Sequence, residues 1–372
     1  MAHVRERDPR HGRRASHQGA PPRGYLCRST PITPTDPAAA RFTDAMHGPR
    51  TSPTTDTSTP GLTFILGCTG CGKASLAREL AHRTDAEILS TDSMKVYRRM
   101  DIGTAKPSPH VRHEIPHHLI DVVDPWEDFS VARYVALADR AIGDIHARRR
   151  PILVVGGTPL YIKALSEGLF EGPGADASLR ERLHSVDQRE GRTVLYERLR
   201  RVDPRAADRI HSNDLKRIIR ALEVHELTGT PISELQHQWD RNRVRYDCRF
   251  IGLRREKEDQ SHRTNQRVKQ MIELGLVDEV KSLLADPNGL SDTARRALGY
   301  AEVIEHLEGR CTLAEAVELI KINTRQFAKA QRTWFKRFHE TDWIDLTPDA
   351  DPDQVADELT SRRSTLWSTS PK

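Results

Sequence analysis

The chain has 372 residues, 30% of them charged and 5% aromatic, a composition typical of a well-solvated globular protein of one large or two modest domains. No run of 18 or more apolar residues occurs, which argues against a membrane span, and five scattered cysteines indicate a reducing cytoplasm rather than a disulfide framework. Residues 1–59 hold nine arginines against five acidic residues, so the remainder carries only about +1 of the net +5, and any nucleic-acid surface there must be a local patch.

The first segment, residues 1–59, is rich in Arg, Pro, Ser, Thr and Gly and has no apolar periodicity. Such a composition cannot bury enough surface to offset the entropy of ordering, so we expect a disordered tail. An arginine-rich transit peptide is an alternative, but acidic residues such as Glu6 and Asp8 argue against it. Translation starting at Met46 is a third interpretation.

Short apolar runs then alternate with helical patterns. The expected strands are residues 63–66, 86–90, 118–123 and 152–155. The expected helices are residues 73–82 and a longer one that Ser130 caps and that ends near residue 149. This alternation predicts an α/β protein whose parallel sheet is flanked by helices on both faces.

The pattern changes after residue 172, where charged helical sequence continues to about residue 240. A further strand is expected at residues 249–253, and residues 257–338 are again helical in pattern. The simplest organisation is one discontinuous core interrupted by a helical insertion. The expected boundaries are 60–172 and 246–345 for the core, 173–245 for the insertion and 346–372 for a C-terminal tail.

A glycine-rich loop joins the first strand to the first helix, and its sequence fits the phosphate-loop pattern G-x-x-x-x-G-K. Backbone N–H groups in such a loop surround phosphate oxygens, and the helix N-terminus adds partial positive charge. The expected phosphate-binding residues are Gly67, Cys68, Thr69, Gly70, Cys71, Gly72, Lys73 and Ala74. Cys68 and Cys71 also form a C-x-x-C pair, but no second pair exists to complete a zinc site.

The loop departs from its pattern at Ala74, where Ser or Thr normally binds Mg²⁺ through a hydroxyl. Either Ser75 substitutes imperfectly as a metal ligand, or Mg²⁺ is held through water and phosphate oxygens. The motif names a phosphate ligand and not a reaction, because kinases, NTPases and diphosphate-using transferases all use it.

Asp92 follows the second expected strand. Ligands of open parallel sheets bind beyond the carboxyl ends of strands, which places Asp92 beside the phosphate loop. It is either a helix N-cap or a carboxylate that accepts a proton or orients a metal-bound water.

Several blocks closely resemble signatures of the tRNA dimethylallyltransferases, bacterial type. They are residues 92–107 (DSMKVYRRMDIGTAKP), 116–121 (PHHLID), 156–161 (GGTPLY), 209–217 (RIHSNDLKR), 220–223 (RALE), 299–300 (GY) and 323–335 (NTRQFAKAQRTWF). The resemblance covers about residues 61–345.

This resemblance implies transfer of a dimethylallyl group from dimethylallyl diphosphate to N6 of adenine-37 in tRNAs that read codons starting with U. The phosphate loop would hold the donor's diphosphate with Mg²⁺, and Arg263 and Arg267 would clamp its charge. Asp92 would be the general base on an extruded adenine, and Thr158 would contact the donor's bridging oxygen or the reacting centre. A cytoplasmic monomer is implied.

The resemblance also implies a surface that binds the anticodon loop. Its expected residues are Asp92, Ser93, Met94, Lys95, Thr158, Arg180, Lys216, Arg217, Ile218, Ile219, Arg220, Arg296, Gly299 and Tyr300. Lys216 and Arg220 share a helical face, although charge pattern alone fits a solvated face equally well. A second basic stripe, a candidate phosphate track, comprises Lys321, Arg325, Lys329, Arg332 and Lys336. The family usually has Lys or Arg where Ala301 stands, so one RNA contact is missing.

Two other functions remain open. A small-molecule kinase would share this fold and use Asp92 to activate a hydroxyl, but it depends on Mg²⁺·ATP, against which Ala74 counts. A non-catalytic RNA-binding protein would keep the basic residues without needing Asp92, Lys73 and Thr158 together. A histidine cluster that could bind a metal comprises His110, His113, His117 and His118.

Overall fold

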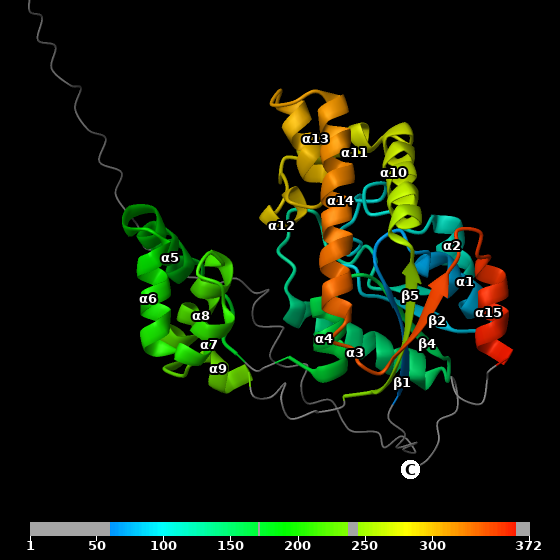
Figure 1. Ribbon diagram of the computed structural model, residues 1–372, viewed down its shortest axis with the longest axis horizontal. Helices are drawn as coiled ribbons and strands as arrows, with labels where there is room; N and C mark the ends of the chain where they lie inside the picture. Colours follow the sequence, from blue (N-terminus) through cyan, green and yellow to red (C-terminus); the bar gives the residue numbers. More distant parts are fainter. Residues whose placement is uncertain (1–59, 170–171, 237–244, 362–372) are drawn as a thin grey trace, which may run out of the picture. The chain divides into compact units, whose positions relative to one another are not determined.

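A computed structural model describes residues 60–169, 172–236 and 245–361, so the expected tail at residues 1–59 lies outside the described part. The described residues contain a six-stranded sheet in the order β3-β2-β4-β1-β5-β6, and every adjacent pair of strands is parallel. Its strands are β1 Gly61–Gly67, β2 Glu87–Ser90, β3 His117–His118, β4 Ile152–Val155, β5 Asp247–Arg255 and β6 Thr341–Leu346. The expected parallel α/β fold is confirmed (Figure 1).

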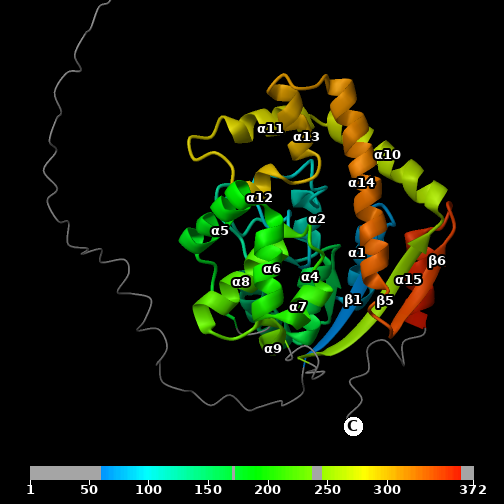
Figure 2. The same ribbon diagram turned by 60° about the vertical axis from the view of Figure 1, so that its left-hand side comes forward.

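Helices connect the strands as parallel pairing requires. Before the insertion they are α1 Lys73–Thr84, α2 Pro109–Glu114, α3 Val131–Ala147 and α4 Pro159–Glu167. After it they are α10 Lys257–Glu273, α11 Leu276–Leu284, α12 Asp292–Arg295, α13 Tyr300–Leu307, α14 Leu313–Phe335 and α15 Pro352–Ser361. Figure 2 shows α10 and α14 running side by side, in agreement with their contacts.

Hydrophobic cores cover both faces of the sheet, which explains why its central strands are continuous apolar runs. On one face Phe64 of β1 packs with Tyr134 of α3 and Ile162 of α4. On the other, Ile65 packs with Leu76 and the rest of the apolar side of α1. This packing fixes β1, β2 and β4 so that their carboxyl ends meet at one edge, where the candidate site lies.

Two expectations about the ends of elements were wrong. The strand predicted at residues 118–123 is only the short β3, because Leu119 and Asp121 adopt left-handed φ angles of 63° and 56° that interrupt it. The range 346–372 was expected to be a tail, but residues 352–361 form α15, whose Ala356 and Leu359 pack against α1. The sequence analysis also missed the edge strand β6.

The insertion is helical throughout its described residues. Its helices are α5 Ala177–Glu190, α6 Arg192–Val202, α7 Pro204–Arg209, α8 Leu215–Thr228 and α9 Ile232–Leu235. They bury a hydrophobic core of their own, centred on residues such as Leu183, Leu195 and Leu222. A separate core gives this segment the means to hold its shape by itself.

Candidate functional site

The glycine-rich loop has the backbone that its sequence predicts. Gly70 and Gly72 adopt φ angles of 81° and 103°, which side chains rarely allow. A Cβ on Gly67 would lie 2.7 Å from Cys71 Sγ and 2.8 Å from Leu253 O, so no larger residue fits there. The loop follows β1 directly and opens α1, whose first-turn N–H groups have no partner within the helix.

Side chains from β5 and α10 hold the loop from outside by its carbonyl groups. Three bonds do this: Gln260 Nε2 to Thr69 O at 2.8 Å, Arg263 Nε to Gly70 O at 3.3 Å, and Arg255 Nε to Cys71 O at 3.1 Å. Because a peptide unit is planar, N–H groups at residues 70 and 72 point opposite to the carbonyls at 69 and 71. The carbonyls are thus turned away from the side on which an anion would bind. Arg263, expected to clamp diphosphate, supports the loop through its Nε, and the clamp stays a prediction.

Gln331 of α14 is a second support, and it connects the loop to β4. Its Oε1 accepts the Thr69 N–H at 2.8 Å, while its Nε2 donates to Gly157 O at 2.6 Å. The residue is 2% exposed. One buried amide therefore fixes the spacing between two strand ends. No role for Gln331 or Gln260 could be predicted from the sequence, because a polar residue inside a helical pattern gives no signal of its tertiary partner.

Lys73 folds back over its own loop. Its Nζ donates to Gly67 O and to Cys68 O, both at 2.7 Å, and lies 3.8 Å from Cys71 Sγ. Both cysteines are buried free thiols, and burial, reinforced by Cys71, raises the pKa of Cys68. A thiol that stays protonated is a poor metal ligand or nucleophile. This argues against a redox or metal role for the C-x-x-C pair.

Asp92 stands directly after β2 and caps the turn that follows it. Its Oδ1 accepts the N–H groups of Met94 at 2.9 Å and Lys95 at 3.3 Å. Among the described residues, no hydrogen bond reaches its Oδ2. No helix begins here, so Asp92 is not the helix N-cap considered from the sequence; its contacts with the turn orient the carboxylate and leave one oxygen for chemistry.

Thr158 joins the ends of β2 and β4. Its Oγ1 accepts the Ser93 N–H at 3.0 Å and donates to Ser93 Oγ at 3.2 Å, and its own N–H donates to Thr91 O at 3.1 Å. Gly156 makes this approach possible, because a Cβ there would lie 2.3 Å from Thr91 Oγ1. The two residues expected to be catalytic, Asp92 and Thr158, are thus brought together through Ser93.

Two cations interact with both the loop and Asp92. Burial lowers the pKa of Arg267 on α10, although Asp92 and Cys71 favour its charged form. Burial also lowers the pKa of Lys95 to about 8; Asp92 opposes this shift, while Arg267 and Lys73 add to it. Lys73 and Asp92 therefore both contribute to the electrostatic environment of the Lys95 ammonium.

A cavity of about 340 Å³ lies between the first turns of α1 and the ends of β2, β3 and β4. Its lining includes Ala74, Ser75, Ser90, Lys95, His117 and Ile120. Direct Mg²⁺ ligation fits poorly here, because Ala74 offers no oxygen and the hydroxyl of Ser75 stands one position later than the loop pattern requires. In the described ranges, no cluster of three or more His, Cys, Asp or Glu residues is placed to hold a metal. The histidine cluster expected from the sequence is therefore not a metal site in this part of the chain.

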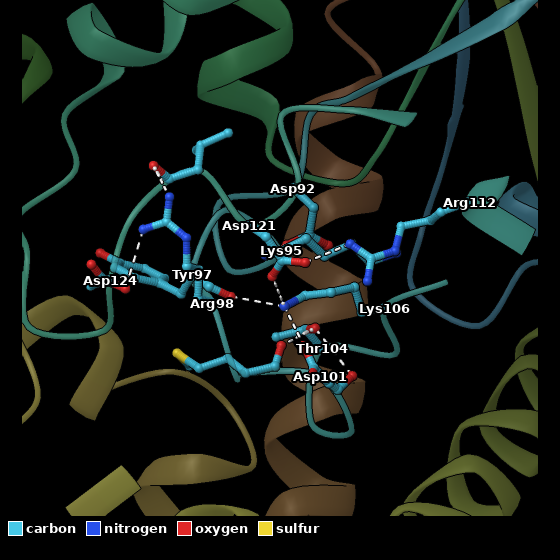
Figure 3. Close-up of polar contacts among 12 residues, drawn as sticks. Asp92, Lys95, Tyr97, Arg98, Asp101, Thr104, Lys106, Arg112, Asp121 and Asp124 are labelled. Carbon is cyan, nitrogen blue, oxygen red and sulfur yellow. Dashed lines mark hydrogen bonds and ion pairs between the residues drawn. The ribbon is translucent and has the colours of Figure 1, made fainter. Parts of the chain in front are cut away.

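A buried lysine fixes the segment that carries Asp92 and Lys95 (Figure 3). Lys106, with a side chain 2% exposed, donates to Tyr97 O at 2.8 Å and Asp121 Oδ1 at 2.6 Å, and it also pairs with Asp101. Arg112 Nη1 holds the other oxygen of Asp121 at 2.5 Å. These contacts explain how a chain with several left-handed residues keeps one conformation.

Three of the expected RNA-binding residues are buried and cannot present their side chains to RNA. Ile218 and Ile219 are 0% and 3% exposed in the core of the insertion. Tyr300 is 0% exposed, and its hydroxyl donates to Glu279 Oε1 at 2.6 Å. Met94 is half-buried and packs against the core that contains Tyr300. Packing in the hydrophobic cores therefore accounts for these side chains.

Two expected RNA-binding arginines are engaged with Glu223, a fully buried carboxylate of α8. Arg180 Nε and Arg220 Nη1 bind it at 2.8 Å and 2.6 Å, and Arg220 also donates to Pro173 O at 2.8 Å. They therefore tie α5, α8 and the start of the insertion together. The interpretation of Lys216 and Arg220 as one RNA-facing pair was wrong, because Arg220 turns toward Glu223.

Some of the other candidates for RNA binding are exposed, and others contact neighbouring elements. Lys216, Arg217 and Arg296 are exposed, and Arg217 and Arg296 form ion pairs with Asp214 and Asp292. Gly299, also expected to bind RNA, is the N-cap of α13 and has a φ of 91°. In the α14 stripe, Arg325 donates to Asn265 Oδ1 at 2.9 Å and Arg332 to Gln260 Oε1 at 2.7 Å. A continuous phosphate track along α14 is thus wrong, because these two arginines join α14 to α10.

Comparison with known proteins now identifies the family. The model of the IPP transferase family matches residues 95–338. The chain is 48% identical over 284 residues to tRNA dimethylallyltransferase 2 of Geotalea uraniireducens, covering 76% of this chain and 92% of that protein.

Solved structures agree. The full-length tRNA isopentenylpyrophosphate transferase of Bacillus halodurans is 40% identical with a TM-score of 0.60, covering 82% of this chain and 95% of that one. A eukaryotic dimethylallyltransferase described as acting on tRNA is 28% identical with a TM-score of 0.69, covering 82% of this chain and 78% of that one. With its phosphate loop, its Asp92 turn and these matches taken together, the chain belongs to the IPP transferase family.

Proposed function

We propose that this chain is a tRNA dimethylallyltransferase that moves the dimethylallyl group of dimethylallyl diphosphate onto N6 of adenine-37, in tRNAs that read codons starting with U. The observation that carries the proposal is that the phosphate loop, Asp92 and Thr158 follow three neighbouring strands, β1, β2 and β4, and that hydrogen bonds of Gln331 and Ser93 join these strand ends. The cations Lys95 and Arg267 lie in the electrostatic field of Asp92. One side of this pocket suits a departing diphosphate and the other suits a proton-accepting carboxylate. None of the helices in the described part of the chain has the length and hydropathy that a bilayer crossing needs.

The donor's diphosphate would lie against the amide side of the loop and the N-terminus of α1. Negative charge builds on it as its bond to the allylic carbon breaks, and fixed N–H groups together with Lys73 stabilise that charge. Lys73 can turn from its own loop carbonyls to phosphate oxygens, because its side chain already lies over the loop. The partly apolar cavity beside α1 offers room for the rest of the donor.

The acceptor reacts through its exocyclic amine. N6 forms the new bond to the allylic carbon, the carbon–oxygen bond to diphosphate breaks, and the N6 proton passes to Asp92. Held by Met94 and Lys95 through Oδ1, Asp92 keeps Oδ2 for this proton. Thr158 positions the Asp92 turn and lies at the reacting end of β4. A stacked base cannot reach this position, so the adenine must be extruded.

Mg²⁺ would enter as the counterion of the donor, held by phosphate oxygens and water, because the side chains around Ala74 form no direct site. On the RNA side, exposed Lys216, Arg217 and Arg296 are the side chains that support contact with the anticodon loop. The free cysteines in the described segments fit a reducing cytoplasm. We propose that the enzyme acts there as a monomer, which light scattering would test.

The test is incubation of the purified protein with labelled dimethylallyl diphosphate and bulk tRNA, followed by nucleoside analysis. We expect label on N6-modified adenosine, and none when ATP replaces the donor. ATP turnover without RNA would favour a kinase. Binding of tRNA without transfer would favour a non-catalytic RNA-binding protein. Family membership supports neither of these two alternatives.

A further inference from the structure

Ala74 and Lys95 line the same cavity. Phosphate loops normally place a hydroxyl at the position of Ala74, where it binds Mg²⁺. Here the methyl group of Ala74 lines the cavity, and so does the side chain of Lys95. A cavity without the usual hydroxyl at position 74 therefore carries a lysine, and the Ser75 hydroxyl lines it as well.

Lys95 is held firmly by its backbone. Its N–H donates to Asp92 Oδ1 at 3.3 Å, and its carbonyl accepts the Asp121 N–H at 3.1 Å. Asp121 is itself bound by Lys106 and Arg112 (Figure 3). This clamp fixes the backbone from which the Lys95 side chain extends to the cavity, so the turn need not be reordered when the ammonium binds an anion.

The charges around Lys95 favour an added anion. The groups that act on its ammonium are Asp92 on its own turn, Lys73 from the loop, Arg267 from α10 and Lys106 from the clamp. Lys106 is already paired with Asp101 and Asp121, but Lys73, Arg267 and Lys95 itself outnumber Asp92, so positive charge stays uncompensated. A diphosphate placed there would restore balance and favour the protonated form of Lys95.

We propose that Lys95 binds the donor's diphosphate and supplies the positive charge that a hydroxyl-bound Mg²⁺ supplies in phosphate loops with Ser or Thr at position 74. Diphosphate binding by this chain is then only weakly dependent on Mg²⁺. Lys95, expected from the sequence to touch tRNA, becomes a donor-side residue. This inference rests on the proposed function.

The test is isothermal titration with inorganic diphosphate, in EDTA and in Mg²⁺, on the full chain. The variants are Lys95→Gln and Lys95→Met, which remove the charge, Lys95→Arg, which keeps it, and Ala74→Thr combined with Lys95→Gln. Lys281→Gln on α11 is the control, because its side chain is 59% exposed and pairs only loosely with Asp278 at 3.7 Å. Circular dichroism checks that each variant is folded.

We expect the wild-type Kd to differ by less than about threefold between the two conditions. Loss of the charge should raise Kd about tenfold or more in EDTA and less in Mg²⁺, since a charge-assisted contact is worth roughly 1.5–3 kcal/mol. Lys95→Arg and Lys281→Gln should stay near wild type. The double variant should recover affinity only with Mg²⁺.

A second readout is the pH profile in EDTA. Wild-type affinity should fall above pH about 8, where unbound Lys95 loses its proton, whereas Lys95→Gln should lack this decline. His117, in the same cavity, has a pKa lowered by burial and is already neutral there. Equal Kd values for wild type and Lys95→Gln in EDTA would overturn the inference, as would a wild type as dependent on Mg²⁺ as the variant. A wild type that binds diphosphate in neither condition would instead defeat the proposed function, and the inference with it.

Discussion

At the scale of single residues, this site gives similar side chains different tasks through their surroundings. Lys106 is buried between carboxylates and fixes a backbone, Lys95 lies among cations beside a cavity, and Lys73 rests on loop carbonyls. Sequence spacing treats all three as positive charges. What separates them is whether an anion of the protein already neutralises each one.

The surroundings of Lys95 predict a pH-dependent cost to stability. Its folded pKa of about 8 lies below its ordinary value of 10.5, so its protonated form opposes folding. This unfavourable contribution to the free energy of unfolding is fully present below pH about 8 and disappears as pH rises to 10.5. We expect Lys95→Gln to raise the free energy of unfolding at pH 7 by about 1–2 kcal/mol, after allowance for partial exposure.

Urea unfolding at pH 7 and pH 10.5 measures this effect, with Lys95→Arg as the control that retains the charge. The gain from Lys95→Gln should vanish at the higher pH. A variant that is less stable than wild type at pH 7 would mean that the cation contributes to the fold, contrary to its proposed role as an anion-binding group.

At the scale of elements, the phosphate loop is shaped by α10 and α14 as much as by its own glycines. Gln331 is the test of this dependence. We expect Gln331→Leu to weaken donor binding about tenfold, because the Thr69 N–H and the Gly157 carbonyl lose their buried partner and the loop shifts. Calorimetry with a donor analogue measures it.

Gln326→Leu is the matched control, since Gln326 lies on the same helix with an exposed side chain. It should leave donor affinity within about twofold of wild type, as surface substitutions usually do. Equal affinities for the two variants would show that α14 does not shape the loop.

The sequence predicted those elements whose pattern is formed by residues adjacent in the chain. The loop was predictable because strand, glycines and lysine are contiguous, and the central strands because both of their faces are buried. The edge strand β6 was missed because its burial pattern is irregular, with no fully buried residue, and because all six of its residues pair with β5, which is distant in sequence. Gln331, Gln260 and the pairing of Arg180 with Glu223 were missed because each is defined by a partner distant in sequence.

At the scale of the whole molecule, the proposed donor site and the proposed RNA contacts at Lys216 and Arg217 fall on different segments of the chain. The described insertion helices have their own hydrophobic core and their own buried ion-pair centre at Glu223. The donor site is built from the sheet edge, α10 and α14. Changes in the exposed basic residues of the insertion should therefore leave donor binding intact.

Lys216→Glu combined with Arg217→Glu tests this separation. We expect tRNA affinity to fall at least about tenfold, because repulsion replaces attraction to phosphates, and donor affinity to stay constant. Filter binding and calorimetry measure the two. Lys269→Glu with Lys281→Glu, an equal charge change at exposed positions of α10 and α11, is the control. Loss of donor affinity alone would refute the RNA assignment.

The most direct measurement is the single-turnover transfer rate of Asp92→Asn with donor and tRNA both saturating, alongside their separate dissociation constants. The amide keeps an Oδ1 that can accept the Met94 and Lys95 N–H groups but cannot take the N6 proton. We expect both ligands to bind within about threefold of wild type and transfer to slow by about 10²–10⁴-fold. Transfer at the wild-type rate would contradict a shared pocket in which Asp92 is the base.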